Sequence, residues 1–156
     1  AMIQKYFNGE LPSEFNGDNR YELGGVDWPT RCADAVKMWK GAIDKFELVK
    51  ATNVPMDLIR DVDLFINDTA PFKLAKDATK QGELGAILYQ CLETLRIATL
   101  LLKPLLPEKM EEFHHAIGLT DQSRAEMQIP DWSGMCAGTA IAKVALYPRV
   151  ELSTAT

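Results

Sequence analysis

Two adjacent histidines, His114 and His115, are the side chains in this sequence whose chemistry best suits a metal ion. Two glutamates, Glu111 and Glu112, precede them and would add carboxylate oxygens. On an α-helix, however, neighbouring side chains point about 100° apart. The two imidazoles therefore cannot chelate one ion as a pair spaced by four residues could. We interpret this segment as a solvated helix face and predict no metal site in the chain.

Two aspartates, Asp57 and Asp61, are spaced so that both side chains reach one side of a helix. A general acid–base pair needs a cleft that shifts the pKa values of its members, and the sequence indicates none. Arg60 and Lys50 are near enough in the chain to offset both charges. The chain also lacks the glycine-rich loops G-x-x-x-x-G-K-[ST] and G-x-G-x-x-G that cradle phosphates. Nothing in the sequence proposes a catalytic residue.

The composition is that of one compact globular domain. The chain has 156 residues, of which 47% are hydrophobic and 25% charged. Its net charge of −5 argues against a protein that binds nucleic acid, DNA in particular, mainly by neutralising phosphates. A local site that stacks unpaired bases stays open, because stacking needs aromatic surface more than bulk charge.

The cellular compartment follows from what the sequence lacks. Its three cysteines are far apart and form no C-x-x-C pair, which is typical of free thiols in a reducing compartment. No signal peptide is visible, and the most apolar stretch, residues 97–106, is too short to cross a bilayer. We expect a cytoplasmic protein without a membrane role.

The spacing of apolar residues indicates an all-α fold. Apolar side chains recur at intervals of three and four along most of the chain, which gives each predicted helix one buried face. A loop is expected over residues 9–29, which are rich in glycine, proline, asparagine and aspartate. The predicted helices cover residues 2–8, 31–51, 55–68, 72–78, 84–102 and 107–117.

Prolines set the predicted helix ends. Pro55 lacks the amide that a continuing helix needs, which predicts a break at residues 52–55. Ala70 precedes another proline and is pushed out of the helical region, so the next helix should end there. We predict an antiparallel helical bundle over residues 2–120. An irregular C-terminal extension, residues 121–156, should pack back on the same domain.

Several segments resemble one known family. Residues 65–77, F-I-N-D-T-A-P-F-K-L-A-K-D, resemble the motif N-x-Y-[IV]-[DN]-E-x-x-P-W-x-L-A-K of methionyl-tRNA synthetases. The class I synthetases for valine, isoleucine, leucine and cysteine share the helical bundle, so a sibling domain is an alternative. The ending L-Y-P-R-V-E favours methionine. Further matches, in the family's order, are the start at residues 2–12, L-Y-Q-C-L-E-T-L-R at 88–96, L-K-P-L-L-P at 102–107, A-I-G-L at 116–119 and A-L-Y-P-R-V-E at 145–151.

The resemblance implies that the chain is the anticodon-binding domain of a larger ligase. The whole enzyme would use ATP and Mg²⁺ to activate methionine and join it to tRNA. Its nucleotide-binding domain, with H-I-G-H and K-M-S-K-S type motifs and a zinc-bearing insertion, is absent from this sequence. We therefore expect the chain alone to be inactive and to hold no cofactor. Its expected partners are the catalytic domain of the same polypeptide and the C-A-U anticodon loop of tRNA(Met).

The resemblance also supplies the candidate anticodon-binding residues. The family stacks a base on the Trp of its P-W pair, and Phe72 occupies that position here, held by Pro71. Asn67 belongs to the same motif. Asp63 replaces the family's Asn and is either structural or accepts a hydrogen bond from a base amine. The family's base-reading Asn and Arg would lie just upstream of Met2.

Other side chains are weaker candidates for RNA binding. Lys73 and Lys76 could meet phosphates or simply solvate a helix face, and Phe72 could instead be a core aromatic. Lys5 and Arg20 are weaker candidates still. A helical module that binds protein rather than RNA is the alternative from another class. The remaining aromatic and basic residues are expected to serve packing: Trp28, Trp39, Trp132 and, tying the tail to the bundle, Arg149.

Overall fold

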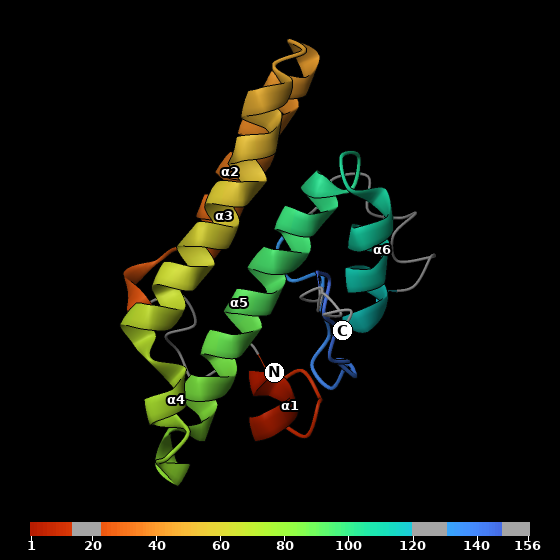
Figure 1. Cartoon of the computed structure of the whole chain (residues 1–156). Coiled ribbons are helices and arrows are strands. Elements are labelled where there is room, and N and C mark those ends of the chain that lie inside the picture. The colour runs from red at the N-terminus through yellow and green to blue at the C-terminus, as the bar shows by residue number, and fades with distance from the viewer. Residues whose placement is uncertain (14–22, 120–130, 148–156) are drawn as a thin grey trace, which may run out of the picture.

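The computed structural model describes residues 1–13, 23–119 and 131–147, and over these ranges the protein is helical (Figure 1). Extended pairing in the described ranges is a single antiparallel bridge between Glu10 and Ala140. The predicted all-α class is thereby confirmed. Helices are α1 (Met2–Tyr6), α2 (Trp28–Asp44), α3 (Leu48–Thr69), α4 (Pro71–Leu74), α5 (Gln81–Leu102) and α6 (Pro107–Ala116), with 3₁₀ turns η1 (Leu23–Gly25) and η2 (Ala78–Lys80).

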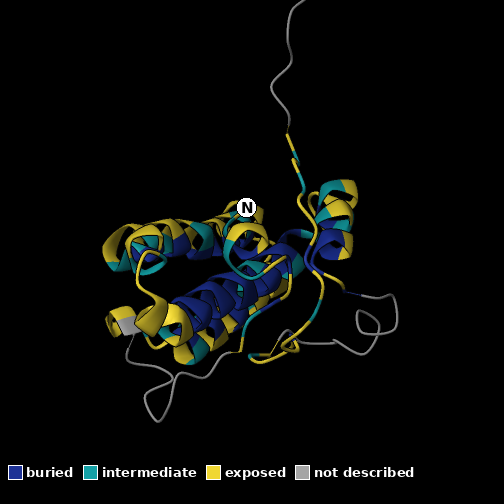
Figure 2. Ribbon diagram, turned by 90° about the horizontal axis from the view of Figure 1, so that it is seen from below, coloured by how far each residue is buried: buried dark blue, intermediate teal, exposed yellow. Residues whose placement is uncertain are grey.

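Helix α5 is the centre of the fold and is buried on nearly every side (Figure 2). The antiparallel helices α2 and α3 pack along one side of it, and α6 returns along another (Figure 1). The helical stretch Ala78–Leu102 is long and apolar enough to cross a membrane, unlike the apolar run at residues 97–106 alone. However, 89% of its most apolar window is buried inside the protein, which is the pattern of a core helix.

The predicted break at residues 52–55 is wrong. Helix α3 runs through Pro55, and the chain reverses instead between Asp44 and Leu48. There Phe46 takes a left-handed conformation, φ 57°, and the Glu47 amide donates to the Ala42 carbonyl at 2.9 Å. An interior proline costs a helix about 3 kcal/mol, but Pro55 lies on the buried face of α3, where packing offsets that cost. No glycine or asparagine marks the actual turn, so local sequence patterns do not predict it.

The described part of the C-terminal extension, residues 131–147, packs back on the helices as predicted. It forms no helix; Met135 and Ile141 pack in the core, and backbone hydrogen bonds join it to the rest of the chain. The Leu11 amide donates to the Thr139 carbonyl at 2.8 Å, and the Ala142 amide donates to Ala116 at 2.6 Å. Arg149 and Arg20, two of the expected basic residues, lie outside the described ranges.

The predicted solvated face of α6 holds for His115 but is wrong for His114. His115 is exposed, whereas the His114 side chain is fully buried. Its Nε2 lies 3.1 Å from the Thr99 hydroxyl, which itself donates to the Leu95 carbonyl at 2.8 Å. A hydroxyl has one proton, so while Thr99 donates to a carbonyl, His114 is the donor in this contact, through Nε2. Its Nδ1 then stays unprotonated and has no hydrogen-bond partner in the described structure.

Burial, with smaller contributions from the charges of Lys103 and Arg96, lowers the pKa of His114 to about 4. In the folded protein the His114 imidazole is therefore protonated only at lower pH, whereas in the unfolded chain it is protonated near pH 6.5. Stability should fall as pH drops from about 6.5 to about 4 and should change no further, on this account, below that range. We expect His114 to lower the free energy of unfolding by up to about 3 kcal/mol over this pH range.

His114→Gln, which stays neutral, should remove this part of the pH dependence when the free energy of unfolding is measured by denaturant titration at a series of pH values. If the free energy of unfolding depends on pH equally in both proteins, the prediction is wrong.

Candidate functional site

The elbow between α3 and α4, residues 69–74, positions the predicted site. Helix α3 ends at Thr69, as the Ala70–proline pair predicted. Ala70 turns left-handed, φ 45° and ψ 57°, while its amide still donates to Ile66 at 3.0 Å. Its carbonyl accepts from the Lys73 amide at 2.8 Å, which closes the first turn of α4. A proline at the first position of α4 fixes the backbone there.

Phe72 projects from this elbow. Pro71 is buried beneath it, but 49% of Phe72 is exposed to solvent. An aromatic ring at a core position would be covered on both faces, so this exposure does not fit the alternative in which Phe72 anchors the bundle. The elbow thus combines a fixed backbone with an open ring, which is what stacking of an unpaired base requires.

The other predicted residues lie around the elbow at different distances along the chain. Lys73 adjoins Phe72 on α4, and Lys76 follows less than one turn later; both are exposed. Neither lysine takes part in an ion pair in the part of the chain that is described. Asn67 is exposed in the last turn of α3, and Asp63 is exposed one turn earlier, about 6 Å back along the axis. Among the described residues, no hydrogen bond or ion pair joins these side chains to one another.

Residues from outside the motif hold the end of α3 in place. The rings of Trp28 and Phe65 meet edge to face, with centroids 5.2 Å apart. Trp28 is 1% exposed, in agreement with its predicted packing role. Gly24, in a left-handed conformation with φ 70°, lies directly against Phe65 and Thr69. Sequence reasoning did not identify this support, because it depends on η1 folding against α3.

A groove of about 320 Å³ runs beside the same end of α3. Leu64 and Asp68 line it from α3, and Arg31 lines it from α2. Arg31 is paired with Asp61 at 2.7 Å, which corrects the expectation that Arg60 and Lys50 offset the α3 aspartates. Of the expected pairs only Arg60 with Asp57, at 2.7 Å, is formed, and Lys50 pairs with Glu47 instead.

Asp77, just past the elbow, is already engaged with its own chain. Its carboxylate accepts from the Thr79 hydroxyl at 2.7 Å and from the Thr79 amide at 3.0 Å. These hydrogen bonds, the hydroxyl first, lower the pKa of Asp77. The pair caps η2, so this carboxylate is a structural group rather than one that faces a ligand.

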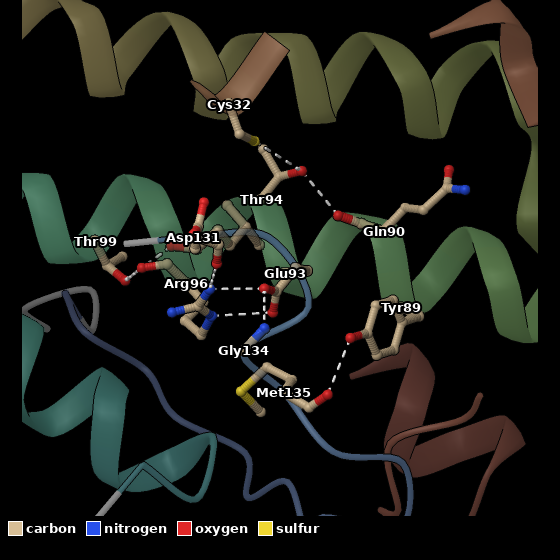
Figure 3. Close-up of polar contacts among 11 residues, drawn as sticks. Cys32, Tyr89, Gln90, Glu93, Thr94, Arg96, Thr99, Asp131, Gly134 and Met135 are labelled. Atoms are coloured by element: carbon tan, nitrogen blue, oxygen red, sulfur yellow. Dashed lines mark hydrogen bonds and ion pairs between the residues drawn. The ribbon is translucent and has the colours of Figure 1, made fainter. Parts of the chain in front are cut away.

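A buried ion pair in α5 is the polar feature that the sequence analysis missed (Figure 3). Arg96 donates to both oxygens of Glu93, at 2.7 and 3.0 Å, and both side chains are fully buried. The Gly134 amide donates to Glu93 at 2.7 Å, and Arg96 also donates to the carbonyl of Asp131. The pair therefore joins α5 to the C-terminal extension. The pair could have been predicted from two opposite charges spaced three residues apart within an otherwise apolar helix.

The cysteines offer no reactive thiolate in the core. Burial raises the pKa of Cys32 to about 12, and burial also raises the pKa of Cys91 to about 12. Both thiols therefore stay protonated at neutral pH. In the described ranges no three His, Cys, Asp or Glu side chains gather as a metal site would require.

Comparisons with known proteins locate this arrangement in a family. No protein-family model matches the chain. The methionine–tRNA ligase of Listeria monocytogenes serotype 4b is 32% identical over 154 residues, 97% of this chain and 23% of that ligase. The methionine–tRNA ligase of Bacillus subtilis strain 168 is 32% identical over 154 residues, 97% of this chain and 22% of that protein. The chain thus spans less than a quarter of the length of these relatives.

Solved structures give the same fold. The apo form of Mycobacterium tuberculosis methionyl-tRNA synthetase matches with a TM-score of 0.76 at 20% identity, covering 97% of this chain and 30% of that one. This likeness shows the fold, and the sequence relatives place the all-α bundle among the helical domains of aminoacyl-tRNA synthetases. More particularly, the chain belongs to the methionyl-tRNA synthetase family, as its motifs predicted.

Proposed function

We propose that this chain is the anticodon-binding part of a methionine–tRNA ligase and recognises the C-A-U anticodon loop of tRNA(Met). The observation that carries the proposal is Phe72, half exposed on a backbone fixed by Pro71 at the position where the family motif has its stacking aromatic. The identity of about 30% to methionine–tRNA ligases over nearly the whole chain supports methionine rather than a sibling amino acid.

In this proposal one unstacked base of the loop lies on the open face of Phe72. Lys73 and Lys76, which have no competing ion pair in the described structure, meet the phosphates on either side. Asn67 offers both a donor and an acceptor to a base edge, whereas the exposed Asp63 accepts from an exocyclic amine. A net charge of −5 suits this division, because binding then depends on a few local groups rather than on a broad basic face.

Catalysis belongs to the rest of the ligase in this proposal. The chain is not expected to supply a nucleophile or an acid–base pair, and ATP, Mg²⁺ and a zinc-bearing insertion would belong to the catalytic domain of the same polypeptide. By binding the anticodon loop, the chain would position the tRNA on the catalytic domain. Such a ligase would work in the cytoplasm.

Replacing Phe72 with alanine should weaken binding of a C-A-U anticodon stem-loop by about 1–3 kcal/mol, because one base loses its stacking surface. The measurement is a titration of the full-length ligase with the labelled stem-loop. Since about half of the surface of Phe72 is exposed, the melting temperature should change little. Phe72→Trp should bind at least as tightly as the natural protein.

The matched control is Leu105→Ala, which removes a similarly exposed apolar side chain, 43% accessible, from the turn after α5. It should leave stem-loop affinity unchanged. A stem-loop with a changed first anticodon base should bind more weakly than C-A-U. Equal affinity for both stem-loops would end the proposal, and preference for another anticodon would assign the chain to a sibling synthetase.

A further inference from the structure

The free end of the α2–α3 hairpin carries an exposed apolar surface that the proposed RNA site does not use. Figure 1 shows this end extending beyond α5 and α6. Phe46 is 87% exposed, Val49 77% and Leu48 59%, and Met38 of α2 adds a further 50% exposed side chain. We call these four residues the hairpin tip. Apolar groups gathered in this way are typical of an interaction site.

The backbone holds the hairpin tip in a defined shape. The Phe46 amide donates to Ile43 at 2.9 Å, and the next amide, of Glu47, donates to Ala42 at 2.9 Å. Phe46 itself is left-handed, φ 57°, a costly conformation for a bulky residue. The aromatic ring is therefore presented outward by a closed turn, as a preformed anchor would be.

The surface also contains a groove. Its volume is about 700 Å³, and it is lined by Met38, by residues 46–50 and by neighbouring α3 residues. The charged residues in its lining are paired: Glu47 with Lys50 at 3.4 Å, and Asp57 with Arg60 at 2.7 Å. An apolar groove whose lining charges are paired fits a protein surface better than a nucleic-acid backbone.

We propose that the hairpin tip docks onto the catalytic part of the same ligase polypeptide. This inference rests on the proposed function. The chain spans 23% of the Listeria monocytogenes ligase and 30% of the solved Mycobacterium tuberculosis chain, so in those proteins most of the polypeptide lies outside this region. The tip lies at the opposite end of α3 from the Phe72 elbow (Figure 1). Docking at one end therefore leaves the other free for RNA.

Thiol labelling in the full-length ligase tests whether the hairpin tip is covered. Val49→Cys places a probe in the tip, and Leu64→Cys, 62% exposed on α3 outside it, is the matched control. Cys136, which is exposed, is replaced by serine in both proteins. Modification of each probe peptide by a thiol reagent is followed by mass spectrometry. We expect Val49→Cys to react at least ten-fold more slowly than Leu64→Cys, and Phe46→Ser to abolish most of that difference.

Three results would overturn the inference. Equal labelling of both probes would mean that the tip is open. Protection that appears only at high protein concentration would assign the tip to a second copy, and protection that needs tRNA would assign it to RNA. The labelling does not depend on anticodon preference. A protected Val49→Cys in a ligase without C-A-U preference would therefore contradict the proposed function alone.

Discussion

Replacing Glu93 with alanine is expected to lower the free energy of unfolding by about 3–5 kcal/mol, because it leaves a fully buried guanidinium without its carboxylate. Arg96 would keep the Asp131 carbonyl as an acceptor, but a carbonyl carries no net charge with which to neutralise the guanidinium. The Gly134 amide would also lose its acceptor, which lies at 2.7 Å. Denaturant unfolding of the natural and altered chains measures the difference.

The matched control for Glu93→Ala is Asp57→Ala, which breaks an exposed ion pair of the same spacing and the same 2.7 Å distance. Water and salt screen that pair, so its loss should cost no more than about 1 kcal/mol. Hydrogen exchange should accelerate at the amides of Gly134 and Met135 in Glu93→Ala, since the ion pair holds the extension against α5. Equal costs for the two substitutions would show that the buried pair has no special structural role.

The helices could be read from the sequence because their signal is local. The apolar spacing of residues 84–102 predicts a wide buried face, and α5 is the most buried helix of the fold. The α3–α4 elbow followed from Ala70 standing before a proline. The same local rule failed at Pro55, because packing of the surrounding α3 face offsets the cost of one missing amide. Local rules thus succeed where tertiary packing agrees with them.

The buried polar groups could not be read in this way. Glu93 and Arg96 are residue types that usually face water, and histidine is intermediate. The extension supplies the ion pair with the Gly134 amide and the Asp131 carbonyl. That contact joins positions about 40 residues apart in the chain. Helical spacing carries no information about it. An ionic pair set three residues apart within an otherwise apolar helix is the pattern that should prompt the search for such a partner.

The candidate site was predicted by resemblance rather than by physics. Composition and spacing favoured a core position for Phe72, and the family motif raised stacking to an equal alternative. The 49% exposure of Phe72 depends on the tertiary structure, because it is set by the direction of α4 relative to α3. The roles of Asp63 and Asn67 remain predictions, because both side chains are exposed on α3 and no described hydrogen bond fixes their geometry relative to the elbow.

Gly24→Ala is the second change with a large expected effect. A Cβ at this position would lie 2.4 Å from Cε2 of Phe65 and 2.9 Å from Cγ2 of Thr69. The Phe65 ring cannot easily retreat, because Trp28 packs edge-on against it at 5.2 Å. Overpacking costs about 1–3 kcal/mol, and a left-handed alanine adds about 1–2 kcal/mol. The free energy of unfolding should therefore fall by about 2–5 kcal/mol in denaturant titrations.

A substitution at the neighbouring glycine separates the cost of the steric clash from the cost of the left-handed backbone. Gly25 has the same φ of 70°, but a Cβ there would meet nothing within 4 Å, so Gly25→Ala should cost only the conformational part, about 1–2 kcal/mol. Because Phe65 and Thr69 form the last turn of α3 before the elbow, Gly24→Ala should also displace Phe72 and weaken stem-loop binding. Gly25→Ala should leave that binding unchanged. If both alanines cost the same and neither alters RNA affinity, then η1 does not position the elbow.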